Sequence, residues 1–199
     1  MTQEERAALV KRGLLLNYAT LGYNAVEAVV AIVAGVMAGS IALLGFGLDS
    51  VVETISSVAA QWRLRTDVHA ARRAHVERLA HRVIGLSFLA LAAYVGYDSV
   101  KTLWERQIPE RSILGVGILS LSVVVMPWLA RKKRDVARLL ASKALEADAK
   151  QTSLCAYLSV IALAGVGLNA ALGWWWADPV AALAMVPIIA IEGVEGVRA

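Results

Sequence analysis

Six long apolar runs, separated by short polar or basic segments, constrain the fold of this chain more than any other feature. Each run is roughly 17 to 24 residues long, which is the length that an α-helix needs to cross the ~30 Å hydrocarbon core of a bilayer. Inside lipid a helix satisfies all of its own backbone hydrogen bonds. The sequence therefore predicts an all-α bundle of six transmembrane helices, over residues 14–37, 41–62, 83–104, 113–129, 154–172 and 177–197.

The composition excludes an ordinary soluble domain. Hydrophobic residues make up 58% of the 199 residues, and the mean hydropathy is +0.61. A soluble core of this length buries its apolar residues on one face of each helix, whereas here they fill long uncharged runs. No Pro-rich or Ser-rich linker divides the chain. We expect a single transmembrane domain over residues 1–199.

Basic residues are distributed unevenly between the two sides of the predicted bundle. Sixteen of the 20 Lys and Arg residues lie in the N-terminal segment or in the segments that follow the second and fourth runs. Because Lys and Arg are retained on the cytoplasmic side, both termini are predicted to be cytoplasmic. The cluster Arg131-Lys132-Lys133-Arg134 is expected in a loop that could also contact anionic lipid headgroups. Topology thus explains the net charge of +4, and no nucleic-acid partner is expected.

Two carboxylates lie inside the second apolar run, where charged side chains are costly. Asp49 and Glu53 are four residues apart, so a helix places them on one face, one turn from each other. Their mutual repulsion is relieved by a bound divalent cation or by a shared proton, which makes the pair a candidate ion site. The alternative is neutralisation by a partner helix. Against it, Lys101 is the one Lys or Arg within the six predicted spans.

A polar stripe also opens the fifth helix. Asp148, Gln151, Cys155 and Ser159 follow one another at spacings of three and four, which places them on one helix face. A thiol together with carboxylates suits a borderline soft metal such as Zn²⁺. The alternative is that Cys155, the only cysteine and hence without an intrachain disulfide partner, is a small buried apolar residue.

Three further groups of polar residues have simpler interpretations. Glu27 and Asn24 share a face of the first helix, where they could join helices by hydrogen bonds or, for Glu27, carry a proton. Asp178 precedes Pro179, which predicts an N-cap of the sixth helix. The histidines are interpreted as parts of a solvated basic loop: His69, His75 and His81.

Several motifs in order resemble the cation diffusion facilitators, a family of six-span antiporters that exchange Zn²⁺ or related divalent ions for protons. The resemblance in the first two helices rests on Asn17, Glu27, Gly35, Gly39-Ser40-Ile41-Ala42-Leu43-Leu44, Asp49-Ser50 and Glu53. Ala147-Asp148 resembles the family's opening of the fifth span, and Gly173-Trp174 and Ala177-Asp178-Pro179 resemble its link to the sixth span. The resemblance extends through all six spans.

The resemblance implies a metal site between the second and fifth helices. Because Gln151 stands where the family usually has His or Asp, it implies a weaker or differently selective site. The implied metal-binding residues are Asp49, Glu53, Cys155 and Gln151, and the implied residues for second-shell contacts or proton coupling are Glu27, Asn24 and Asp148.

The resemblance also implies partners and a location. It implies efflux of a divalent metal, with Zn²⁺ favoured over Cd²⁺, Co²⁺, Fe²⁺ or Mn²⁺, in exchange for protons and with no permanently bound cofactor. We expect a homodimer in a lipid bilayer, as a multi-pass integral protein of a bacterial inner membrane. The cytoplasmic C-terminal domain usual in the family has no counterpart here, so a membrane-only branch is expected.

Two other classes of protein are alternatives to a transporter. A non-transporting membrane scaffold or regulatory partner would use the buried acids to fix helix packing. An intramembrane hydrolase is disfavoured because the sequence has neither a nucleophile elbow nor an HExxH zinc motif. No enzymatic activity is expected.

Overall fold

The computed structural model describes residues 3–65, 70–140 and 143–198, with the side chains at 6, 56, 59–81, 141–144 and 147 left out of the description. Within these ranges the chain is helical apart from short turns, which confirms the predicted all-α fold. The three histidines lie outside the described side chains. The six helices are α1 (Gln3–Ala38), α2 (Ile41–Arg65), α3 (Ala70–Glu105), α4 (Ile113–Leu140), α5 (Lys143–Leu172) and α6 (Ala177–Arg198).

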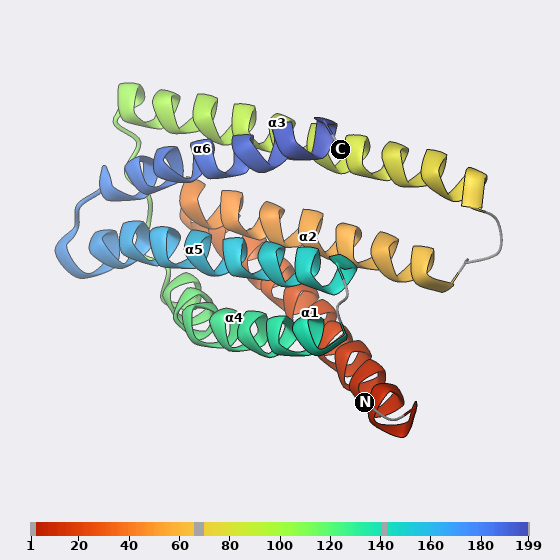
Figure 1. Ribbon diagram of the computed structural model, residues 1–199. Coiled ribbons are helices and arrows are strands. Elements are labelled where there is room, and N and C mark those ends of the chain that lie inside the picture. The colour runs from red at the N-terminus through yellow and green to blue at the C-terminus, as the bar shows by residue number, and fades with distance from the viewer. Residues whose placement is uncertain (1–2, 66–69, 141–142, 199) are drawn as a thin grey trace.

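Five of these helices are long and apolar enough to cross a membrane, counted over the described residues: α1, α3, α4, α5 and α6. The helix α2 is not among them, although it runs alongside the others (Figure 1). It has several polar side chains, and these are buried within the protein: Asp49, Ser50, Glu53 and Ser57. Large apolar side chains are exposed on the outer faces of the bundle, as lipid contact requires. The protein is therefore a multi-pass integral membrane protein.

The helices alternate in direction, so the N-terminal end of α1 and the C-terminal end of α6 lie at the same end of the bundle (Figure 1). The helices α3 and α6 lie side by side, next to a group formed by α1, α2, α4 and α5. The helix α2 contacts α1, α3, α5 and α6, which gives it a central position. This position explains why its polar residues meet other helices rather than lipid.

Glycines end two of the helices and allow one very close helix contact. Gly39 and Gly173 have φ values of 62° and 70°, which favour glycine and stop α1 and α5. At the α3–α6 contact, a Cβ atom on Gly85 would lie 2.5 Å from the backbone nitrogen of Val197, and one on Gly193 would lie 2.8 Å from Leu89. The two backbones therefore approach each other without intervening side chains.

Asp178 does not cap its own helix, so that prediction was wrong. It lies inside the first turn of α6, and its carboxylate accepts hydrogen bonds from Ser40 Oγ at 2.5 Å and from the backbone nitrogen of Ile41 at 2.9 Å. Ile41 is the first residue of α2, whose N–H groups have no partner within the helix. Asp178 thus caps α2 across the bundle, because the turn before α6 lies against the turn before α2.

Candidate functional site

A small cavity of about 10 Å³, roughly the size of one water molecule, lies where α2, α3, α5 and α6 meet. All four residues that the sequence suggested as metal ligands line it: Asp49, Glu53, Gln151 and Cys155. The other lining residues are apolar except for one acid of α6, Glu192. The structure therefore brings the predicted residues of α2 and α5 to one place.

The helix α2 positions both of its acids toward this cavity. Asp49 is 6% exposed and Glu53 is 1% exposed, so both acids are buried. Their spacing of four residues places both on one face, as expected. Glu53 Oε1 lies 3.2 Å from Thr152 Oγ1, whereas Glu53 Oε2 is buried without a hydrogen-bond partner. An unpaired buried carboxylate oxygen is costly, and it is suited to accept a cation.

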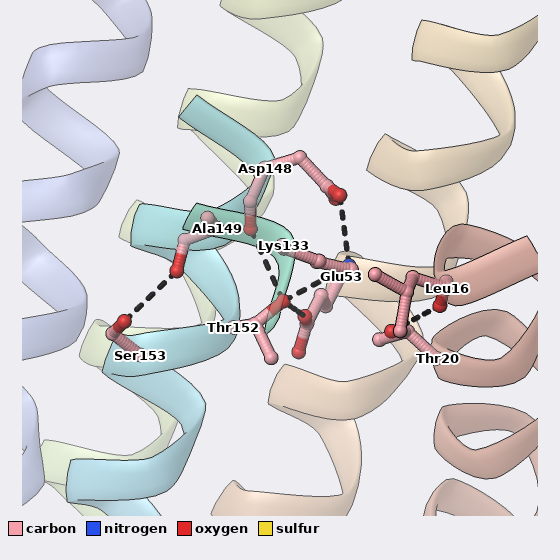
Figure 2. Close-up of polar contacts among 8 residues, drawn as sticks. All are labelled: Leu16, Thr20, Glu53, Lys133, Asp148, Ala149, Thr152 and Ser153. Atoms are coloured by element: carbon pink, nitrogen blue, oxygen red, sulfur yellow. Dashed lines mark hydrogen bonds and ion pairs between the residues drawn. The ribbon is translucent and has the colours of Figure 1, made fainter. Parts of the chain in front are cut away.

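A buried lysine lies on the other side of Glu53. Lys133 is fully buried, and its Nζ atom is 2.8 Å from Asp148 Oδ2 and 3.2 Å from Thr152 Oγ1 (Figure 2). The single hydroxyl proton of Thr152 reaches either Glu53 or the Asp148 backbone oxygen, at 3.2 and 3.1 Å. When it is donated to Glu53, a continuous chain of hydrogen bonds links the ammonium group to that carboxylate.

This lysine corrects two expectations from the sequence. The cluster Arg131-Lys132-Lys133-Arg134 is part of α4, which continues to Leu140, and is not a loop at the headgroups. The argument that no basic residue is available to neutralise the buried acids also fails, because Lys133, just beyond the predicted span 113–129, faces the protein interior. A repeating spacing could have revealed it, since the buried residues of α4 include Met126, Leu129, Ala130, Lys133, Val136 and Ala137.

Asp148 does not line the cavity. It forms an ion pair with Lys133 outside it. Its side chain is 14% exposed, so the ion pair is at the edge of the interior. The structure thus places Asp148 one step behind Glu53, with Lys133 and Thr152 between them. The role in metal binding or proton coupling that the resemblance implied for Asp148 stays a prediction.

Glu27 lies at the centre of a second polar cluster. It accepts hydrogen bonds from Ser50 Oγ at 2.8 Å and from Ser122 Oγ, and Ser122 in turn is 2.8 Å from the hydroxyl oxygen of Tyr23. Cys155 Sγ lies 3.8 Å from Glu27 Oε2, at the limit of a weak hydrogen bond. Cys155 therefore connects the Glu27 cluster with the cavity, and Ser50 connects Glu27 with α2 beside Asp49.

Asn24 is fully buried on α1 and lies near the Glu53 carboxylate. Neither its side-chain oxygen nor its nitrogen has a hydrogen-bond partner that meets distance and angle requirements. Such orphaned polar groups are rare in a folded interior. Together with the free Glu53 oxygen, they mark the region between α1 and α2 as polar beyond what helix packing requires.

Glu192 was not among the site residues predicted from the sequence. This acid of α6 lines the cavity opposite Asp49 and Glu53, and Lys150 Nζ lies 3.7 Å from its Oε1 atom. It went unnoticed because it lies near the end of the last apolar run. Its presence inside that run, where charges are costly, is the signal that could have found it.

The side chains around the cavity are near one another but do not yet form a coordination sphere. Among the residues that the structure describes, no three His, Cys, Asp or Glu side chains are placed to share one metal ion. Glu53 is directed partly toward Thr152, and Cys155 partly toward Glu27. The side chains of this cavity would have to rotate or approach one another to enclose an ion.

The fold and the site define a class of protein: a helical, multi-pass membrane protein whose interior holds several acids around a small cavity. Residues 18–199 match the family model of the cation efflux transmembrane domain. The chain belongs to the cation efflux family.

Three curated relatives are similar to this chain. It is 28% identical to Transmembrane protein 163 of Xenopus laevis over 138 residues, which cover 69% of this chain and 49% of that protein. It is 28% identical over 180 residues to an uncharacterized transporter of Synechocystis sp., with 83% and 56% of the two chains covered. It is 26% identical over 173 residues to an uncharacterized transporter of Methanocaldococcus jannaschii, with 84% and 61% covered. The chain thus spans about half of the length of the relatives it matches.

Proposed function

We propose that this protein is a transporter that moves a divalent metal ion of the Zn²⁺ type out of the cell in exchange for protons. One observation carries the proposal: Asp49, Glu53, Gln151 and Cys155, from two helices, line one buried cavity. Membership of the cation efflux family supports cation transport as the class of activity. Two relatives are named as transporters.

In the proposed mechanism, the carboxylates of Asp49 and Glu53 bind the metal when ionised and release it when they take up protons. The Cys155 thiolate would add a soft donor and favour Zn²⁺ or Cd²⁺ over Mn²⁺. Gln151 would supply a neutral oxygen. The site would open to one side of the membrane at a time, as in other transporters with a site between helices. We further propose a homodimer in the cell membrane.

The proposal can be tested by metal flux into proteoliposomes that contain the purified full chain. Zn²⁺, Cd²⁺, Co²⁺, Fe²⁺ and Mn²⁺ are supplied in turn, with and without a proton gradient. Asp49→Asn should abolish the flux, whereas Asp98→Asn should not, because Asp98 lies in the candidate span of α3 but does not line the cavity. Equal flux in both variants would refute the site. No flux of any of the five ions in the unmodified protein would refute the function.

A second candidate function is a membrane scaffold or regulatory partner whose acids fix the helix packing. The observation in its favour is Lys133, a buried cation that already pairs with Asp148 and reaches Glu53 through Thr152. The two functions differ in whether metal binds the folded protein. Binding of an ion to the native state raises the unfolding temperature. A Zn²⁺-dependent rise that disappears in Asp49→Asn supports the transporter, and an unchanged unfolding temperature supports the scaffold.

A further inference from the structure

Glu192 is the most exposed of the acids that line the cavity. Of the three carboxylates that line the cavity, those of Asp49 and Glu53 are buried, whereas the Glu192 side chain is 23% exposed. Glu192 lies toward the C-terminal end of α6, at the end of the bundle that also holds the N-terminal end of α1 (Figure 1). An ion that arrives from this end meets Glu192 before it reaches the two buried carboxylates.

A cation of the protein itself, Lys150, already lies beside Glu192. Lys150 of α5 has its Nζ atom 3.7 Å from Glu192 Oε1 and 2.9 Å from Glu195 Oε2. The Lys150 side chain is 59% exposed, so its ammonium group is held by two surface contacts that contribute little to stability. A divalent ion can therefore displace the Lys150 ammonium group at a small cost in free energy.

The inner part of the cavity gives an independent sign that a cation belongs there. Glu53 is 1% exposed, lines the same cavity and has a carboxylate oxygen, Oε2, without a hydrogen-bond partner. Lys133 approaches the other side of this residue, through Thr152 and Oε1. The cavity is thus lined by a buried carboxylate oxygen of Glu53 without a hydrogen-bond partner and by a more exposed acid, Glu192, that pairs with Lys150.

We propose that Glu192 is a cation-binding residue of the transport path. The ammonium group of Lys150 pairs with the Glu192 carboxylate until a divalent ion displaces it. This inference rests on the proposed function, because it assigns a further residue to the same cavity. It gives α6 a direct part in ion capture, beside the acids of α2 and the donors of α5.

The chain offers a matched control, because Glu195 also pairs with Lys150 but does not line the cavity. Binding of Zn²⁺ and Cd²⁺ to the purified full chain is measured by calorimetry, and flux is measured in proteoliposomes. Glu192→Gln should weaken Zn²⁺ affinity by about tenfold and raise KM, whereas Glu195→Gln should change neither by more than about twofold. Lys150→Gln should strengthen binding, because it removes the competing cation. Glu192→Asp should restore part of the affinity.

The outcomes separate this inference from the proposed function. If the unmodified protein binds and transports Zn²⁺, Asp49→Asn abolishes both, and Glu192→Gln behaves like Glu195→Gln, then the inference alone is overturned. If the unmodified protein binds none of the ions, both proposals fail. Unfolding temperatures of the variants exclude misfolding. A Glu192→Gln protein that unfolds early is replaced by Glu192→Ala, which also lacks the carboxylate and for which unchanged affinity and KM would likewise overturn the inference.

Discussion

Lys133 Nζ on α4 lies 2.8 Å from Asp148 Oδ2 on α5, with the lysine side chain fully buried. The pair joins the end of α4 to the beginning of α5. Removing one member of such a buried pair leaves the other charge without its partner, at a cost of about 3 to 5 kcal/mol.

Lys133→Met is therefore expected to lower the free energy of unfolding by about 3 kcal/mol, the smaller figure because Asp148 is partly exposed. Lys132→Met, at the adjacent and partly exposed position, should change little. The double variant Lys133→Met/Asp148→Asn should lose less than the sum of its parts. Unfolding in detergent, followed by circular dichroism, is measured for the unmodified protein, these three variants and Asp148→Asn alone. A Lys133→Met protein as stable as Lys132→Met would contradict the role assigned to the pair.

Asp178→Ala is expected to loosen the first turn of α2. The substitution removes the acceptor of the Ile41 N–H and the Ser40 hydroxyl, and loss of a helix cap costs about 1 to 2 kcal/mol. Asp178→Asn keeps one oxygen and should be milder. Hydrogen exchange at the Ile41 amide should become faster in the Ala variant, and an unchanged exchange rate would show that the cap is not needed.

The close contact between α3 and α6 predicts different effects for two glycines. A Cβ atom on Gly85 would lie 2.5 Å from the Val197 nitrogen, so Gly85→Ala should destabilise the protein by about 1 to 3 kcal/mol. Gly117→Ala meets no atom within 4 Å outside its own helix and should stabilise α4 slightly, since alanine is the better helix former. Thermal unfolding of the two variants gives the comparison. The same sign for both would refute the packing argument.

Cys155→Ser tests whether the thiol is a ligand. If it is, the substitution should weaken Cd²⁺ binding much more than Mn²⁺ binding, because sulfur gains little from a hard cation. Cys155→Asp should reduce the preference for Cd²⁺. Affinity in the unmodified protein should rise with pH, since thiol and carboxylates must lose protons to bind a metal. Calorimetry that finds both affinities unchanged in Cys155→Ser would leave Cys155 as a buried packing residue.

The predicted orientation can be tested by labelling with an impermeant thiol reagent in intact cells. The native cysteine, Cys155, is buried, so we expect the reagent to react only with cysteines introduced at exposed positions. Arg138→Cys on α4 should be protected, and Glu110→Cys, which lies before α4 at the opposite end of the bundle, should react. The reverse pattern would mean that the termini face outward.

The sequence predicted the helices well because lipid imposes a simple requirement on each apolar run. It also predicted that Asp49 and Glu53 share a face and that Gln151 and Cys155 share another, since these follow from helix geometry. Whether the two faces meet is a question of packing, and the structure answers it with a common cavity. Their role as metal ligands stays a prediction.

Lys133 and Glu192 left signals in the sequence, whereas the partner of Asp178 left none. Lys133 looked like a loop residue because the apolar run ends before it, although the helix continues to Leu140. Asp178 looked like a cap of the nearest helix, because spacing along the chain says nothing about a turn from elsewhere in the fold. A contact between helices distant in sequence decides the role of Asp178.

The hydrogen bonds of Asp178 attach α6 to α2 near one end of the bundle, whereas Glu192 lies about 14 residues further along α6, at a distance of about 21 Å. A tilt of α6 that keeps these hydrogen bonds intact has Asp178 as its pivot. Displacement then grows with distance from the pivot, so a small rotation beside Ser40 becomes a large separation between α6 and α5 at Glu192. A tilt of this kind would widen the cavity at the Glu192 end of α6 while α6 stays joined to α2 beside Ser40.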